Sequence, residues 1–325
     1  MRVGIVIPQG HFGEFEGWDV RAAWSRTLEV ARLAHSLGFD SLWGSEHVVT
    51  KWGGEQPLFD CWTTMTAVAQ AVTGASIGFV TLCTPFRNPA LTAKMAATLD
   101  VVSDGRLTLG LGAGWKEAEF RAYGYEFMPL GERLALLGEH LEIISRMVTA
   151  DGGPVTFTGR YAHVEGAVNN PRGLQRPRIR IMVGGHGPNV TFRLAARHAD
   201  EMNIDVTPKE VAGALPVLRE RCEEIGRDPA TLAVSALIAG AWPWQGLRST
   251  GGQRLMGLNE AAFIPAEALA NLGTRQEGLA LLQSIGCLRA VAGVPGLAAT
   301  DETLHEFAED CRAAGIALSA EAVPG

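Results

Sequence analysis

Short β-branched segments alternate with long helical segments along nearly all of this chain, and the alternation limits the folds it can adopt. Parallel strands need a crossover connection, usually a helix, so the pattern predicts an α/β fold with a parallel sheet. About eight such units fit a closed (β/α)8 barrel of the TIM type better than an open doubly wound sheet. The strands are expected at residues 2–8, 41–46, 75–82, 106–111, 178–183, 201–204, 231–238 and 288–291.

Two segments interrupt this alternation without suggesting a domain boundary. Residues 155–164 alternate at period two about a Gly-Arg turn, which predicts an inserted β-hairpin. Residues 241–265 contain tryptophans and glycines with little periodicity, and a long irregular segment of this kind is usually a functional lid or a mobile loop. Since no linker is evident, we expect residues 1–325 to form one barrel domain.

Charge and cysteine content exclude several classes of protein. The formal net charge is -7 and the pI is near 5.7, whereas a nucleic-acid-binding protein usually carries a basic face. A ligand phosphate must therefore be held locally, by main-chain amides or a few arginines. The five cysteines are scattered and form no Cys-x-x-Cys pair, which is typical of free thiols in a reducing compartment. Without a long apolar run for a signal peptide or a membrane span, we expect a cytoplasmic protein.

Histidines follow two of the expected strands, at the end of the barrel where active sites lie. His47 comes directly after the second strand, and histidine is the natural proton donor near neutral pH. His47 is therefore the candidate catalytic group, and the alternative is a packed or helix-capping histidine. His11, after the first strand, is a less specific candidate, which we expect to contact the substrate.

Tryptophans occur both inside apolar segments and after strands. Trp18, Trp24 and Trp43 lie among apolar residues, which indicates core positions. Trp52 and Trp115 follow strands and are candidates for the lining of a pocket, Trp52 on the substrate side.

Glycines at two strand ends offer bare main chain to a ligand. Gly184, Gly185 and His186 follow the fifth strand and precede a helix expected from about Asn189, so their amides predict a phosphate cradle. Glycines also serve ordinary tight turns, which is the alternative. The run 110–114 lacks the full Gly-x-Gly-x-x-Gly spacing and lies on the fourth strand, so it does not indicate a Rossmann fold. These glycines instead let a flat ligand approach the backbone.

Other chemistries lack their motifs. The eight histidines include no His-x-His pair and no His-Glu-x-x-His, so we expect no metal site. A Gly-x-Ser-x-Gly elbow, the mark of a serine hydrolase in an α/β fold, is also absent.

Several segments together resemble the luciferase-like oxidoreductases. Leu-Gly-Phe-Asp-Ser-Leu-Trp-Gly-Ser-Glu-His at 37–47 is similar to the second-strand signature of this family. Gly-Leu-Gly-Ala-Gly-Trp at 110–115 and Met-Val-Gly-Gly at 182–185 match its fourth and fifth units. Further matches lie at residues 88–100, 103–106 and 195–200. The resemblance extends over roughly residues 1–240 and then fades.

This resemblance implies a barrel that holds the ring of FMN or of the deazaflavin coenzyme F420 at the strand ends. The Gly-Ala-Gly-Trp and Gly-Gly segments resemble the deazaflavin branch more than the FMN monooxygenases. In that branch the histidine matching His47 lies beside the reactive carbon of the ring, and the acid matching Glu46 contacts the coenzyme. The further coenzyme contacts that the resemblance implies are Val80, Thr81, Ala113, Gly114, Trp115, Val183, Gly184, Gly185 and His186. Relatives also hold a non-proline cis peptide beneath the ring, which predicts one at Val80–Thr81.

The resemblance leaves the substrate and the exact reaction open. The sugar-phosphate dehydrogenases of the branch have a glutamate where this chain has Trp115, and a lysine where residues 205–207 stand, which suggests a larger and more apolar organic substrate. We expect hydride transfer in a homodimer, with a separate enzyme to reduce the coenzyme. One alternative is an FMN-dependent monooxygenase fed by a partner reductase. The other is a non-catalytic flavin-binding protein.

Overall fold

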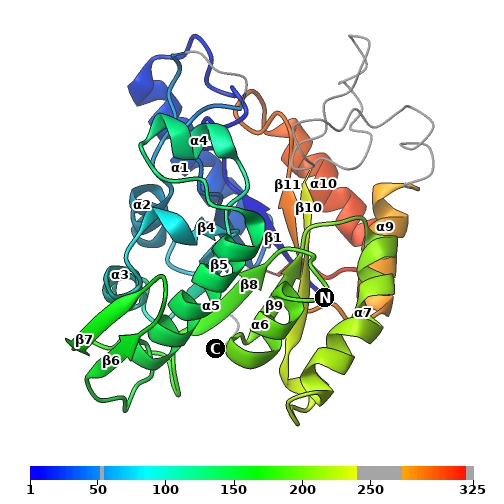
Figure 1. Cartoon of the computed structure of the whole chain (residues 1–325). Helices are drawn as coiled ribbons and strands as arrows, with labels where there is room; N and C mark the ends of the chain where they lie inside the picture. The colour runs from blue at the N-terminus through cyan, green and yellow to red at the C-terminus, as the bar shows by residue number, and fades with distance from the viewer. Residues whose placement is uncertain (52–54, 240–272, 320–325) are drawn as a thin grey trace.

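Parallel strands form a closed barrel in this protein, as the computed structural model shows for residues 1–51, 55–239 and 273–319 (Figure 1). The sheet order is β3-β2-β1-β11-β10-β9-β8-β5-β4, and a further pairing between β3 and β5 closes the ring. Because β4 continues the path of β3 along β5, these two strands together occupy one position in the barrel. The barrel therefore has eight strand positions, which confirms the predicted TIM-type fold. The barrel strands are β1 (Arg2–Val6), β2 (Ser41–Gly44), β3 (Ser76–Phe79), β4 (Leu82–Cys83), β5 (Leu107–Gly112), β8 (Arg180–Gly184), β9 (Glu201–Ile204), β10 (Ala233–Ala239) and β11 (Arg289–Gly293).

Helices surround this barrel, and several begin at a side chain that caps the first turn (Figure 1). Asp19, Asp60 and Asn88 accept main-chain N–H bonds at the starts of α1, α2 and α3. Thr207 and Thr274 form capping boxes at α7 and α9. The helices are α1 (Val20–Ser36), α2 (Cys61–Ala71), α3 (Pro89–Val102), α4 (Glu117–Ala122), α5 (Leu130–Met147), α6 (Thr191–His198), α7 (Pro208–Glu223), α9 (Arg275–Ser284) and α10 (Glu302–Ala313), with short 3-10 turns η1 (Thr84–Phe86) and η2 (Pro229–Thr231).

One indole fills much of the barrel interior. Trp43 is fully buried and packs with a small apolar cluster that includes Val80, Met182 and Val291. Added Cβ atoms at Gly4 and at Gly78 would each lie 2.4 Å from the Trp43 ring, so only glycine fits at these two positions on the neighbouring strands. The barrel is therefore closed by packing, and ligand chemistry is confined to its ends.

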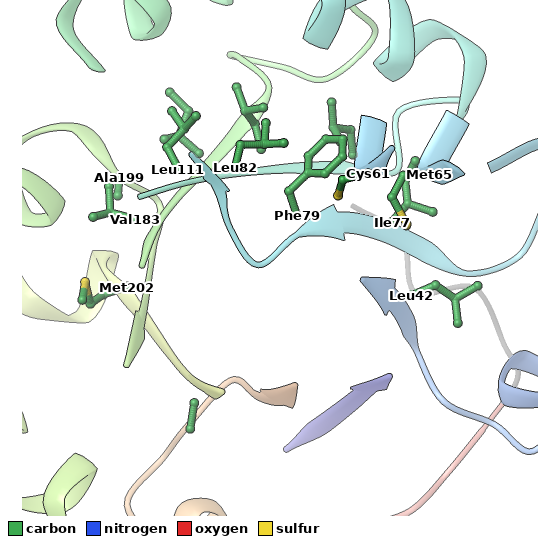
Figure 2. Packing of buried hydrophobic residues seen from close by; sticks show 14 of the residues in the cluster. Leu42, Cys61, Met65, Ile77, Phe79, Leu82, Leu111, Val183, Ala199 and Met202 are labelled. Atoms are coloured by element: carbon green, nitrogen blue, oxygen red, sulfur yellow. The ribbon is translucent and has the colours of Figure 1, made fainter. Parts of the chain in front are cut away.

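A second apolar layer joins the outer face of the barrel to the helices. Figure 2 shows Ile77 and Phe79 of β3 next to Cys61 and Met65 of α2. Leu42 belongs to the same cluster, whereas its neighbour Trp43 faces the interior. This alternation is the period-two pattern of a strand that is buried on both faces.

The third strand position departs from a regular strand, as the resemblance to the luciferase-like family implied. One strand was predicted over residues 75–82, but β3 ends at Phe79 and β4 begins at Leu82. The peptide bond between Val80 and Thr81 is cis, which confirms the predicted position of this bond.

Of the predictions for the inserted segments and the tryptophans, the structure confirms some and contradicts one. The hairpin is confirmed as β6 (Val155–Thr158) paired antiparallel with β7 (His163–Ala167), and it projects near the end of the barrel opposite to α4 (Figure 1). Trp43 is in the core as predicted, but Trp18 is 37% exposed, so its prediction was wrong. Trp18 packs only one edge against the buried Phe15. The irregular segment 241–265 lies outside the described residues, and no described helix is long and apolar enough to cross a membrane.

Candidate active site at the carboxyl ends of the strands

Two histidines from neighbouring strand ends stack on each other. His11 follows β1 and His47 follows β2, and because these strands are paired in the barrel their loops meet. The ring centroids are 3.4 Å apart and the ring planes differ by 9°. The two candidate histidines are thus brought into one site.

A buried carboxylate completes this site. Glu119 of α4, only 3% exposed, lies with its Oε1 2.9 Å from His47 Nδ1. A carboxylate accepts this hydrogen bond, so the proton lies on Nδ1 and the opposite nitrogen, Nε2, is left for a ligand. Sequence reasoning missed Glu119. The available signal was its position four residues after Trp115, where the chain leaves the fourth strand end.

The partners of His11 define its state. The carbonyl oxygen of Val49 lies 3.0 Å from His11 Nδ1, and because a carbonyl only accepts, this nitrogen carries the proton. Burial lowers the pKa of His11 to about 2, and the charges of His47 and Lys116 act in the same direction. His11 is therefore a neutral ring stacked on His47.

A buried lysine balances the charge of Glu119. Lys116 is 4% exposed, and its Nζ lies 3.7 Å from Glu119 Oε1 and 3.4 Å from the carbonyl oxygen of Thr50. Buried charges are stable only when they are paired. The pair allows an ionised carboxylate beside His47 in a site from which water is largely excluded.

His11, His47 and Glu119 form a group of the kind that can hold a metal ion. Ligand atoms of His11, His47 and Glu119 lie within 4.8 Å of one another. However, the Nδ1 atoms of the histidines are engaged by Val49 and Glu119. The stacked rings also lie in nearly parallel planes, so one metal ion could not lie in the plane of both rings. The geometry favours proton chemistry, and the absence of a metal stays a prediction.

Glu46 has partners within the chain. Its Oε2 accepts a hydrogen bond of 2.7 Å from the main-chain N–H of Cys83, and its Oε1 lies 2.5 Å from Arg87 Nη2. Burial raises the pKa of Glu46, and Arg87 opposes that shift. Glu46 thus connects the ends of β2 and β4, while its expected contact with a coenzyme stays a prediction.

Glycines leave room around the side chain of Thr81. An added Cβ would lie 2.5 Å from Thr81 Oγ1 at Gly112 and 2.5 Å from Thr81 Cγ2 at Gly184. The Thr81 side chain therefore packs directly against the main chain of Gly112 and Gly184, and a side chain at either position would displace it. Gly114 and Gly185 have φ values of 73° and 135°, which favour glycine, and both continue this glycine-lined rim.

The predicted contact residues differ in which of their atoms can reach a ligand. The side chain of Val80 lies in the barrel interior and that of Val183 in the outer layer, so each can contribute only main chain at the mouth. Ala113 is half-buried between the rim glycines. Trp115 is 43% exposed and meets the His47 ring edge-on at 6.2 Å, whereas Trp52 lies outside the described residues.

The turn predicted to hold a phosphate follows β8, the fifth strand of the barrel in chain order. His186 follows Gly185, and its Nδ1 lies 2.8 Å from Asp205 Oδ1 at the end of β9. Hydrogen bonding to Asp205 raises the pKa of His186, so this exposed ring gains positive character. The helix α6 begins at Thr191, two residues after the predicted start, so the turn is longer than expected.

Comparison with known proteins extends these observations. The family described as luciferase-like monooxygenase matches residues 1–241. An F420-dependent glucose-6-phosphate dehydrogenase of Amycolatopsis mediterranei (strain U-32) is 35% identical over 177 residues, which are 53% of this chain and 51% of that protein. The chain therefore matches about half the length of this curated relative.

Two solved structures share the fold over almost their whole length. An F420-dependent secondary alcohol dehydrogenase in complex with an F420-acetone adduct superposes with a TM-score of 0.71 and 20% identity, covering 97% of this chain and 99% of that one. A riboflavin lyase with modified FMN and riboflavin has a TM-score of 0.72 and 14% identity, covering 100% of this chain and 94% of that one. At these identities the likeness concerns the fold alone.

Proposed function

Because this chain belongs to the luciferase-like monooxygenase family, we propose that it is an oxidoreductase that uses coenzyme F420 to reduce an organic substrate. The observation that carries the proposal is His47, which is held by the buried Glu119 beside the glycine-lined rim around Thr81. The curated relative quoted above is named for its dependence on F420.

The residues at the mouth suit a flat ring with a phosphate-bearing tail. The ring would rest on the main chain at Val80–Thr81, and the Thr81 side chain fits beside this segment only because Gly112 and Gly184 lack a Cβ. The phosphate would be held by the amides of Gly185 and His186. When bound, the deazaflavin supplies two electrons as hydride, so the protein has to supply orientation and a proton.

His47 is the group that we assign to that proton. Among the described residues, no hydrogen bond engages the Nε2 atom of His47. The Nδ1–H group of the same ring donates to Glu119. Glu119 stabilises the protonated imidazole, and the neutral His11 on its face adds no competing charge. A positioned acid–base group of this kind typically contributes about 10²–10⁴-fold to a rate.

The substrate is the least constrained part of the proposal. In place of the cation that a sugar phosphate would need, Asp205 stands at the sixth strand end and engages His186. We therefore propose an uncharged organic substrate with an activated C=C, C=N or C=O bond. The homodimer, the separate coenzyme-reducing enzyme and the cytoplasmic location stay predictions.

An anaerobic reaction tests this function against its alternatives. The purified protein and reduced F420 are mixed with a panel of uncharged enones, imines and ketones, and oxidation of the coenzyme is followed by absorbance. We expect oxidation without oxygen, with one reduced product formed for each coenzyme oxidised. Oxidation that occurs only with oxygen would favour a monooxygenase, and no reaction with any coenzyme would favour a non-catalytic flavin-binding protein.

A further inference from the structure

A cavity of about 260 Å³ lies beside the stacked histidines, between the ends of β1 and β11. Its walls come from the residues that follow each strand, so it opens at the same end of the barrel as His47. His11 lines the cavity and stacks on His47, and Ser45 lines it from the strand that carries His47. A molecule in this cavity therefore contacts His11, and the ring of His11 stacks on the proposed acid–base group His47.

The walls of this cavity are mainly apolar. Ile7 and Pro8 come from the end of β1, and Phe12 from the loop behind it. Val294 and Leu297 follow β11, and both are buried. Burial of a ligand's apolar surface against these walls would stabilise the complex by about 25 cal/mol for each Å² removed from water.

The only acid among the described lining residues, Glu14, already accepts three main-chain hydrogen bonds. Glu14 Oε1 accepts hydrogen bonds from the N–H groups of Gln9 and Gly10, and Oε2 accepts one of 2.7 Å from Phe12. No lysine or arginine occurs among the lining residues that the structure describes. An anionic ligand would therefore lose its hydration without gaining a partner, which costs several kcal/mol for an unpaired ion. A cationic ligand would have to share the Glu14 carboxylate with the three amides that already bind it.

The polar side chains that remain are His11 and Ser45, and both can accept a hydrogen bond from a ligand. Gln9 Oε1 is occupied by the N–H of Ser45 at 2.9 Å. His11 donates through Nδ1 to Val49, so its Nε2 is an acceptor. Because burial lowers the pKa of His11 to about 2, this nitrogen stays an acceptor at any ordinary pH.

We propose that this cavity binds an uncharged, mainly apolar molecule with one hydroxyl or N–H group, about the size of an aromatic ring with a short substituent. An apolar cavity of roughly 150 Å³ holds benzene, so about 260 Å³ accommodates such a molecule but not a sugar phosphate with its ions. That the bound molecule is the substrate, or its reduced product, rests on the proposed function. The binding itself does not.

Binding of three matched probes tests the proposal directly. Benzyl alcohol, benzoate and benzylammonium are titrated into the full-length protein, with and without F420, and binding is followed by calorimetry and by ligand-observed NMR. We expect benzyl alcohol to bind at least tenfold more tightly than either ion, which corresponds to about 1.4 kcal/mol. Equal or tighter binding of benzoate or benzylammonium would overturn the proposal.

Two variants locate the probe. Val294→Phe adds volume inside the cavity and should weaken benzyl alcohol at least tenfold, with the unfolding temperature as the check on folding. Phe12→Ala removes a wall in the partly exposed loop and should leave benzyl alcohol bound. We also expect this variant to bind 2-naphthalenemethanol and the unaltered protein to exclude it. If Val294→Phe does not fold, the Phe12→Ala result decides, and equal selectivity of that variant and the unaltered protein would refute the location.

The outcome for the cavity is separable from the outcome for the coenzyme. If benzyl alcohol binds as described but the protein has no affinity for F420, the cavity stands and the proposed function fails. If F420 binds and none of the probes shows the expected selectivity, the cavity assignment fails while the coenzyme assignment stands.

Discussion

Replacing Glu119 with glutamine should slow turnover while leaving the coenzyme site in place. The substitution keeps the shape of the side chain but removes the charge that faces His47 Nδ1 at 2.9 Å. A hydrogen bond to a charged group is worth about 1.5–3 kcal/mol, so losing this stabilisation of the protonated imidazole corresponds to about a ten- to hundredfold lower rate. The loss should appear in the rate of turnover and not in coenzyme affinity.

The chain offers a matched control on the same helix. Glu117 lies two residues before Glu119 on α4, but its side chain is 48% exposed and pairs with Arg121. Glu117→Gln should therefore leave the rate unchanged. The assay is single-turnover oxidation of reduced F420 by an accepted substrate, with coenzyme affinity measured alongside.

Folding has to be checked because Glu119 also lies near the buried Lys116. Breaking a buried ion pair costs about 3–5 kcal/mol, so thermal unfolding should accompany each measurement. Glu119→Asp keeps the charge and should recover part of the rate, and Lys116→Met with Glu119→Gln removes both buried charges if the single variant does not fold. A folded Glu119→Gln protein with the rate of Glu117→Gln would refute the positioning role.

Three further predictions concern His47, His11 and Gly184. His47→Gln should keep coenzyme affinity within a few-fold and slow turnover about 10²–10⁴-fold, and near-normal turnover would reduce His47 to a packing role. The pKa of His11 is lowered to about 2 in the fold from an unfolded value near 6.5, so the unfolded chain binds the extra proton and the free energy of unfolding falls as pH drops below 6.5. Between pH 7 and pH 5 His11→Gln should lose about 2 kcal/mol less than the unaltered protein, measured by urea unfolding, and identical losses would contradict this. Gly184→Val should weaken F420 binding because a Cβ there would lie 2.5 Å from Thr81, and unchanged affinity in a titration would contradict the proposed ring site.

The barrel could be predicted from the sequence because its signals are local. The strand at Glu201–Ile204 was predicted with its exact bounds, and the hairpin at Val155 was predicted from period-two alternation. The burial of Trp18 was not, because apolar neighbours do not reveal which face of the first loop meets the core. The glycines at Gly4 and Gly78 had no local signal either, since their reason is an indole on another strand.

The candidate site was predictable only in part for the same physical reason. The position of His47 after a barrel strand follows from the sequence order, and its resemblance to a known signature named it as the acid–base group. Its partner Glu119 is 72 residues away along the chain, and the stacking of His11 depends on two loops that meet only in the closed barrel. The pairing of Glu46 with Arg87 also needs the path of η1, which no periodicity indicates.

Coenzyme binding tests the central claim most directly, because it needs no knowledge of the substrate. Purified protein is titrated with F420 and with FMN, each oxidised and reduced, and dissociation constants are measured by fluorescence or calorimetry. The account predicts micromolar or tighter binding of F420 and at least tenfold weaker binding of FMN, a difference of about 1.4 kcal/mol. Equal or tighter binding of FMN would contradict the coenzyme assignment and leave only the barrel.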